Sequence, residues 1–102
     1  SPSRGLGDVY KRQALGMKEK RFSTANYTLR LIRFEDDFKE TDWCHKGHIG
    51  FVLAGEMNID FGGQIVHFKK GDGLSIETGE KNKHKAIIAK GKFAELILFE
   101  SN

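Results

Sequence analysis

The chain of 102 residues has only one cysteine and one proline. The lone cysteine, Cys44, excludes an intramolecular disulfide and suits a reducing compartment. The longest run of large apolar residues, Leu96-Ile97-Leu98-Phe99, is far too short to cross a bilayer, and the N-terminus lacks the apolar core of a secretory signal. We therefore expect a cytoplasmic protein with no membrane partner.

The excess of positive charge is small and unevenly placed. The formal net charge is +3, and Arg4, Asp8, Lys11 and Arg12 together contribute +2 of it, which leaves +1 for residues 14–102. Nucleic-acid binding needs a basic stripe or patch, and the lysines here lie among acidic residues. The chain also lacks a phosphate-binding glycine loop and a dinucleotide fingerprint. We expect no nucleic-acid partner.

The N-terminal segment differs in composition from the rest of the chain. It holds the only proline, is rich in glycine and serine, and shows no sustained periodicity. Residues 5–13 resemble a translated vector or adaptor sequence, and an ordinary disordered leader is the alternative. We expect residues 1–16 to be a non-native or disordered leader, and residues 17–102 to form one domain with a single core.

From residue 26 onward, short runs of strand-forming residues alternate with turn residues every 8 to 12 positions, which is typical of an all-β protein. No segment keeps a helical period for three turns, although one helical turn is expected near Met17 to Arg21. Six to eight strands are expected, at residues 27–34, 49–54, 57–61, 64–68, 74–77, 84–89 and 93–100. A closed barrel or jelly roll would leave no exposed sheet edge.

Polar residues with metal-binding side chains gather just before the strand predicted at residues 49–54. Asp42, Cys44 and His48 are separated by even numbers of residues, so a regular strand would place them on one face. A bend at Gly47 would let a carboxylate, a thiolate and an imidazole converge, and His84 could supply a fourth ligand. These groups suit one divalent ion such as Zn²⁺, Fe²⁺ or Mn²⁺ better than Mg²⁺.

The spacing of the glycines in this region resembles the two motifs of the cupin superfamily. Gly55 follows His48 at the interval of the first motif, and Gly71 and Gly79 keep the glycine interval of the second. The resemblance covers residues 27–99 and implies a single-domain cupin double-stranded β-helix, a jelly-roll barrel that is commonly dimeric and holds its site inside.

The positions of the usual cupin ligands carry other residues in this chain. Asp42 and Cys44 stand where the motif has paired histidines, and His48 stands where it has glutamate. Asn82 replaces the histidine of the second motif, with His84 displaced from it by two residues. The glycine framework is therefore kept while the ligand set is changed.

Each of these residues also has an ordinary structural interpretation. Cys44 could be a small buried hydrophobic residue, and His48 a hydrogen-bonded core histidine. Trp43, Phe51 and Asn82 are candidates to contact a ligand at the barrel mouth, although Trp43 could instead anchor the core or a dimer. Phe51 is expected to face outward, where a second subunit of a homodimer would cover it.

Two classes of function fit this sequence. In the first, the barrel binds a small polar molecule through a divalent metal, and His48 or His84 moves a proton. In the second, a metal-free degenerate cupin acts as a small-molecule binding or sensing module. Nucleophilic catalysis by Cys44 with His48 as base is also conceivable, but no sequence feature supplies a third group to orient the histidine.

Overall fold

The computed structural model describes residues 10–102 and shows a protein built almost entirely from strands. The strands are β1 (Lys11–Ala14), β2 (Met17–Ser23), β3 (Tyr27–Glu35), β4 (His48–Asp60), β5 (Ile65–Lys69), β6 (Gly73–Ile76), β7 (Lys85–Ile87) and β8 (Phe93–Ser101). One short 3₁₀ helix, η2 (Glu80–Asn82), precedes β7. Within residues 10–102, no helical segment has the length and hydropathy of a membrane span.

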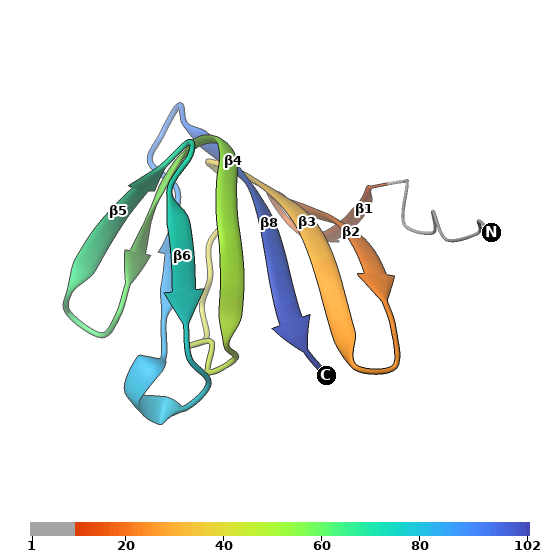
Figure 1. The fold of residues 1–102 in the computed structure, drawn as a ribbon. Coiled ribbons are helices and arrows are strands. Elements are labelled where there is room, and N and C mark those ends of the chain that lie inside the picture. The colour runs from red at the N-terminus through yellow and green to blue at the C-terminus, as the bar shows by residue number, and fades with distance from the viewer. Residues whose placement is uncertain (1–9) are drawn as a thin grey trace.

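All strand pairs are antiparallel, and the long strand β4 takes part in two sheets. One sheet has the order β1-β2-β3-β8-β4-β6, in which β6 pairs with the first half of β4. The other sheet pairs the second half of β4 with β5 on one side and β7 on the other. Figure 1 shows β6, β4, β8 and β3 side by side, with β5 at the opposite side of the molecule from β1 and β2. The all-β jelly-roll expectation is confirmed.

The passage of β4 from one sheet to the other depends on a bulge. The pairing of β4 with β8 shifts register between Val52 and Ala54, and Gly55 follows with a positive φ of 75°. Bulges bend a strand, and the left-handed conformation suits glycine because it has no Cβ. The two strands expected at 49–54 and 57–61 are one strand, so that expectation is wrong, because Gly55 bends the strand without ending it.

Two further expectations near the N-terminus differ from the structure. The helical turn expected at Met17 to Arg21 is wrong, because these residues belong to β2 and pair along their whole length with β3. Lys11–Ala14, within the expected leader, forms β1 and pairs with β2. Sheet hydrogen bonds to distant residues override weak local preferences here. The rest of the leader expectation, for residues 1–9, lies outside the described residues.

The inner face of the first sheet is apolar at one end and charged at the other. Alternate residues of β3, β4 and β8 point inward, and Ile32, Val52 and Ala94 are among the most buried. The alternation in β8 also buries Glu100, and Glu19 in β2 is buried as well. Because buried charges are costly unless paired, this end of the barrel must hold compensating cations.

The close approach of β4 and β8 gives a test of the fold. A Cβ added at Gly50 would overlap the backbone carbonyl of Ile97, whereas the nearest atom to one added at Gly73 would be on the Phe51 ring, at 3.4 Å. We expect Gly50→Ala to lower the free energy of unfolding by about 1–3 kcal/mol, because the backbone must shift. Gly73→Ala should change it by less than about 1 kcal/mol. Urea unfolding of both variants checks this, and equal losses would contradict the close approach.

Candidate functional site

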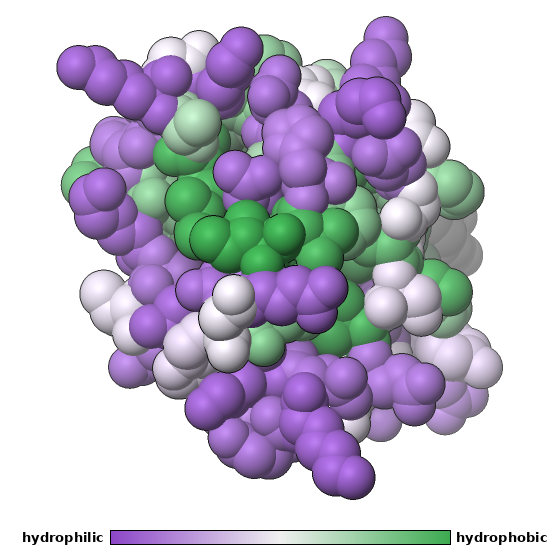
Figure 2. Space-filling view, turned by 90° about the vertical axis from the view of Figure 1, so that its left-hand side faces the viewer, coloured by the Kyte–Doolittle hydropathy of each residue, from purple (hydrophilic) through white to green (hydrophobic). Residues whose placement is uncertain are grey.

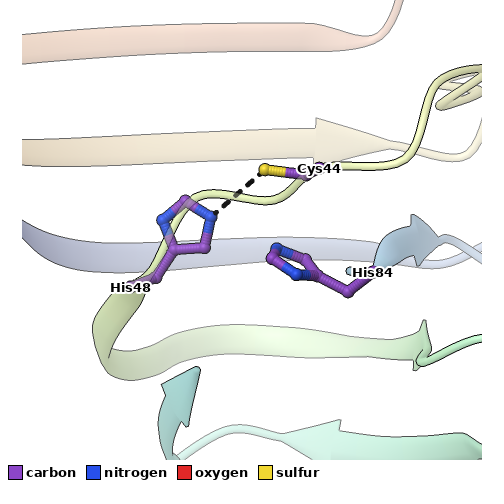
Figure 3. Close-up of side chains that lie close together, drawn as sticks. All are labelled: Cys44, His48 and His84. Atoms are coloured by element: carbon purple, nitrogen blue, oxygen red, sulfur yellow. Dashed lines mark hydrogen bonds between the residues drawn. The ribbon is translucent and has the colours of Figure 1, made fainter. Parts of the chain in front are cut away.

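The candidate site is formed by Cys44, His48 and His84 at the charged end of the barrel (Figure 3). Cys44 lies in the segment before β4, His48 is the first residue of β4, and His84 immediately precedes β7. One ligand atom from each residue lies within 4.8 Å of the other two, and Cys44 Sγ is 3.7 Å from His48 Nε2. Residues 40 positions apart in the chain therefore present a thiol and two imidazoles to one point.

Backbone hydrogen bonds hold Cys44 and His84 next to each other. The two residues form an isolated antiparallel bridge, in which each N–H donates to the carbonyl of the other at 2.9 Å. The chain then turns through residues 45–47 before β4 begins, so that the His48 side chain returns toward Cys44. The turn near Gly47, and not a regular strand, makes the convergence possible.

Both histidine rings are oriented by acceptors on their Nδ1 atoms. His48 Nδ1 lies 2.6 Å from Glu100 Oε2, and His84 Nδ1 lies 2.9 Å from the backbone carbonyl of Asn82. A carboxylate and a carbonyl can only accept, so Nδ1 carries the hydrogen in each ring. The remaining nitrogen, Nε2, is then free to act on the Cys44 side as a base or as a metal ligand.

A buried charge network supports His48 from behind. Glu100, whose side chain is 1% exposed, accepts a hydrogen bond from Arg30 at 2.7 Å and lies 3.2 Å from Lys46 Nζ. Arg30 also binds the buried carboxylate of Glu19. Burial opposes ionisation of Glu100, but the hydrogen bonds from His48 and Arg30 outweigh it and lower the pKa to about 2. Glu100 is therefore a fixed anion beneath the histidine.

The thiol of Cys44 is strongly acidified by its neighbours. Hydrogen bonds with His48 and His84 lower the pKa of Cys44 to about 5, although partial burial works in the opposite direction. Burial alone would lower the pKa of His48, but the hydrogen bonds with Cys44 and Glu100 raise it overall. The arrangement favours a thiolate, which is the form that binds metals and attacks electrophiles.

A cavity of about 130 Å³ opens beside this cluster. Its polar end is lined by Arg30, Glu40, Cys44, His48 and His84, and its remaining walls are largely apolar. This volume holds several water molecules or one small ligand. The thiol and the imidazoles therefore face a partly open cavity in which a small molecule would contact both apolar walls and polar groups.

Glu40 and Glu100 are site residues that the sequence analysis did not identify. Glu40 Oε1 accepts a hydrogen bond from the Ala86 backbone N–H at 2.7 Å, and burial raises the pKa of its carboxyl group. No periodic pattern surrounds Glu40, so nothing in the sequence marks it. For Glu100 a signal existed, because the alternation of the last strand places it on the same face as the inward-facing Leu96 and Leu98.

The other predicted site residues lie outside the cluster. Asp42 is exposed and does not belong to the group of three converging ligands. Phe51 is 56% exposed and points away from the cavity, as its outward orientation in the strand requires. Asn82 has an exposed side chain and contributes only its backbone carbonyl to His84. The Trp43 ring is half-buried beneath the ammonium groups of two lysines.

Comparisons with known proteins identify the fold. No protein-family model and no curated protein matches the chain. Among solved structures, an RmlC-like cupin from Shewanella frigidimarina superimposes with a TM-score of 0.77 at 17% identity, covering 99% of this chain and 91% of that one. KdgF from Halomonas sp. gives a TM-score of 0.73 at 16% identity, covering 92% and 86%.

A third similar structure is the polyketide cyclase RemF from Streptomyces resistomycificus, with a TM-score of 0.74 at 15% identity, covering 96% of this chain and 69% of that one. At these identities the likeness concerns the fold, since one architecture hosts many activities. The resemblance found in the glycine spacing is confirmed by the arrangement of the strands. The chain has the cupin fold, with a Cys-His-His group at the polar end of its barrel.

Proposed function

We propose that this cupin domain binds one divalent transition metal through Cys44, His48 and His84, and a small molecule beside it in the cavity. The observation that carries the proposal is the orientation of the two histidines. Each has its Nδ1–H engaged by an acceptor, which leaves Nε2 directed to the same point as the thiol. Hydrogen bonds of this kind to the second ring nitrogen are characteristic of metal-binding histidines.

The chemistry of the donor set favours Zn²⁺ among the metals considered. One thiolate and two imidazoles are common zinc ligands, and the soft sulfur disfavours Mg²⁺. The separation of 3.7 Å between Cys44 Sγ and His48 Nε2 is close to that expected for two ligands of one tetrahedral zinc ion. Three protein ligands would leave a coordination position for water or a bound molecule, as in catalytic zinc sites.

Such a metal would act as a Lewis acid toward an oxygen of the bound molecule. The protein itself supplies the surroundings of that molecule. The apolar walls disfavour strongly charged compounds. The small volume limits the ligand to a few non-hydrogen atoms. Glu40, which lines the same cavity and whose pKa is raised by burial, is suited to exchange a proton with the ligand.

A metal-free binding or sensing module is the second candidate. It is favoured by the walls of the cavity, which are mainly apolar and would bind a small molecule without a metal. Metal titration distinguishes the two candidates. For both candidates we propose a cytoplasmic location, because a reducing compartment would keep the acidified thiol of Cys44 from forming a disulfide.

The metal proposal predicts one Zn²⁺ per chain by isothermal titration calorimetry, with Mg²⁺ giving no binding. We expect Cys44→Ser to weaken Zn²⁺ binding by more than about 100-fold. Loss of a residue that only supports a metal ligand lowers the affinity by roughly 10- to 100-fold, and this substitution removes the ligand itself. Asp42→Asn should leave the affinity unchanged, because Asp42 lies outside the cluster. With Co²⁺ as probe, a thiolate-to-metal absorption band should appear and should be absent in Cys44→Ser. Absence of Zn²⁺ and Co²⁺ binding would refute the proposal.

We also propose that the outer face of the first sheet pairs with a second copy of the chain. Leu29 lies opposite Phe99, which lies opposite Ile49, so these side chains form a row across β3, β8 and β4. Phe51 and Leu53 extend the row along β4, and all five are exposed large hydrophobic residues. A flat apolar surface is self-complementary under twofold symmetry, whereas a charged surface is not.

Introducing a positive charge on this face tests the dimer. We expect the wild-type protein to be a dimer by size-exclusion chromatography with light scattering, and Phe51→Lys or Phe99→Lys to be monomeric because a charge would be buried in the interface. Figure 2 shows a second apolar band, on the side of the molecule where β5 lies. Ile65→Lys, on β5, is therefore the control and should remain dimeric. A monomeric wild type at high concentration would contradict the proposal.

A further inference from the structure

Cys44, His48 and Glu100 are aligned in a way that the metal proposal does not require. His48 lies between the other two, with Nε2 3.7 Å from Cys44 Sγ and Nδ1 2.6 Å from Glu100 Oε2. A nucleophile, a base and a group that orients the base are the three parts of the catalytic triads found on unrelated folds. The orienting group that the sequence did not reveal is thus supplied by the end of β8.

We propose that, in the metal-free protein, Cys44 is a nucleophile activated by His48 and Glu100, and that it reacts covalently with small uncharged electrophiles in the cavity. This activity is separate from metal binding, although both use Cys44 and His48. The two would exclude each other in one molecule, because a metal would occupy the sulfur and Nε2.

The triad is held by groups that the structure buries. The Glu100 carboxylate cannot rotate toward solvent without breaking its ion pair with Arg30, and Arg30 is itself fixed by Glu19. Cys44 is fixed through its main chain, by the two backbone hydrogen bonds to His84. The base therefore has one orientation, and the nucleophile has a fixed position in front of it.

His84 completes the surroundings of the sulfur. Its ring meets that of His48 edge to face, with centroids 5.2 Å apart, and its Nε2 is left free by the bond from Nδ1 to Asn82. The sulfur thus lies within reach of two imidazoles, one oriented by a carboxylate and one by a carbonyl. Transfer of the Cys44 proton to His48 Nε2 would leave a thiolate beside the His48 imidazolium, which stabilises it.

The cavity defines the class of electrophile. Cys44 and His48 lie at its polar end, and the walls beyond them are apolar. A volume of about 130 Å³ admits a compound of a few non-hydrogen atoms, such as a small amide or carbonyl compound with an electrophilic carbon. An anionic reagent would have to leave water and approach the thiolate, the Glu40 carboxylate and the apolar walls, so uncharged reagents are favoured.

Iodoacetamide is a suitable probe because it is small and uncharged. The Cys44 thiol passes its proton to His48 Nε2, and the sulfur then attacks the methylene carbon of the reagent. A carbon–sulfur bond forms, the carbon–iodine bond breaks, and iodide leaves with the bonding electron pair. His48 returns the proton to solvent, so one carbamidomethyl group, one iodide and one proton account for the whole reaction.

The experiment measures the rate of this modification by intact-protein mass spectrometry, in buffer with a chelator. We expect the folded wild type to react much faster than the same chain unfolded in urea. His48→Gln should slow the reaction by about 100-fold, in the range expected for loss of a general base. Glu100→Gln should slow it by at least about tenfold, because the amide no longer imposes one tautomer on His48.

Matched controls separate the triad from general effects of substitution. His45→Gln removes a histidine adjacent to Cys44 that is exposed and pairs with Glu80, and Glu95→Gln removes a carboxylate from the same strand as Glu100. Both should react at the wild-type rate. If His48→Gln reacts as fast as wild type, or if the folded wild type reacts no faster than the unfolded chain, the proposal is overturned.

Two further measurements keep the test decisive. Circular dichroism tests whether each variant is folded. If Glu100→Gln is unfolded, nitrogen NMR of His48 in the wild-type protein takes the place of the rate measurement on that variant. A hydrogen on Nδ1 then supports the triad, and a hydrogen on Nε2 alone overturns it.

Added Zn²⁺ tests the metal proposal separately. Protection of Cys44 supports metal binding and lack of protection contradicts it, while the comparison of His48→Gln with wild type is unaffected.

Discussion

The site depends on one buried carboxylate, Glu100, at the end of β8. It accepts hydrogen bonds from Arg30 of β3 and His48 of β4, and it lies beside Lys46 in the turn before β4. Three segments that are distant in sequence are thus joined at the polar end of the barrel. Because removal of one partner would leave a charge buried and uncompensated, the network constrains the position of His48 more tightly than packing alone would.

The fold brings these groups together through the path of a single strand. β4 begins in the first sheet with His48, bends at the bulge before Gly55, and continues in the second sheet, where it pairs with β5 and β7. His84, directly before β7, is therefore carried to the same end of the barrel as His48. The apolar part of the core fills the rest of the interior, which leaves the polar groups around one small cavity.

Much of the fold could be predicted from local patterns, because alternation and turn glycines act over a few residues. The strand expected at residues 27–34 is present as β3 (Tyr27–Glu35). The site was harder to predict. The even spacing of Asp42, Cys44 and His48, with a bend at Gly47, predicted that all three converge. Cys44 and His48 do converge, but Asp42 lies outside the group. Glu100 is 52 residues from His48, and no local pattern connects them.

The order of the residues was sufficient to predict an all-β chain and a cupin-like glycine framework, and to mark Cys44, His48 and His84 as candidate ligands. The strand pattern and the candidate ligands rest on periodicity and side-chain chemistry, which are local properties of the chain, whereas the cupin expectation rests on resemblance to the family's motifs. The tertiary structure alone decided which nitrogen of each histidine is free, which carboxylate lies behind His48, and that Asp42 is exposed. These features depend on contacts between strands far apart in sequence, and such contacts exist only after the sheets have closed around the core.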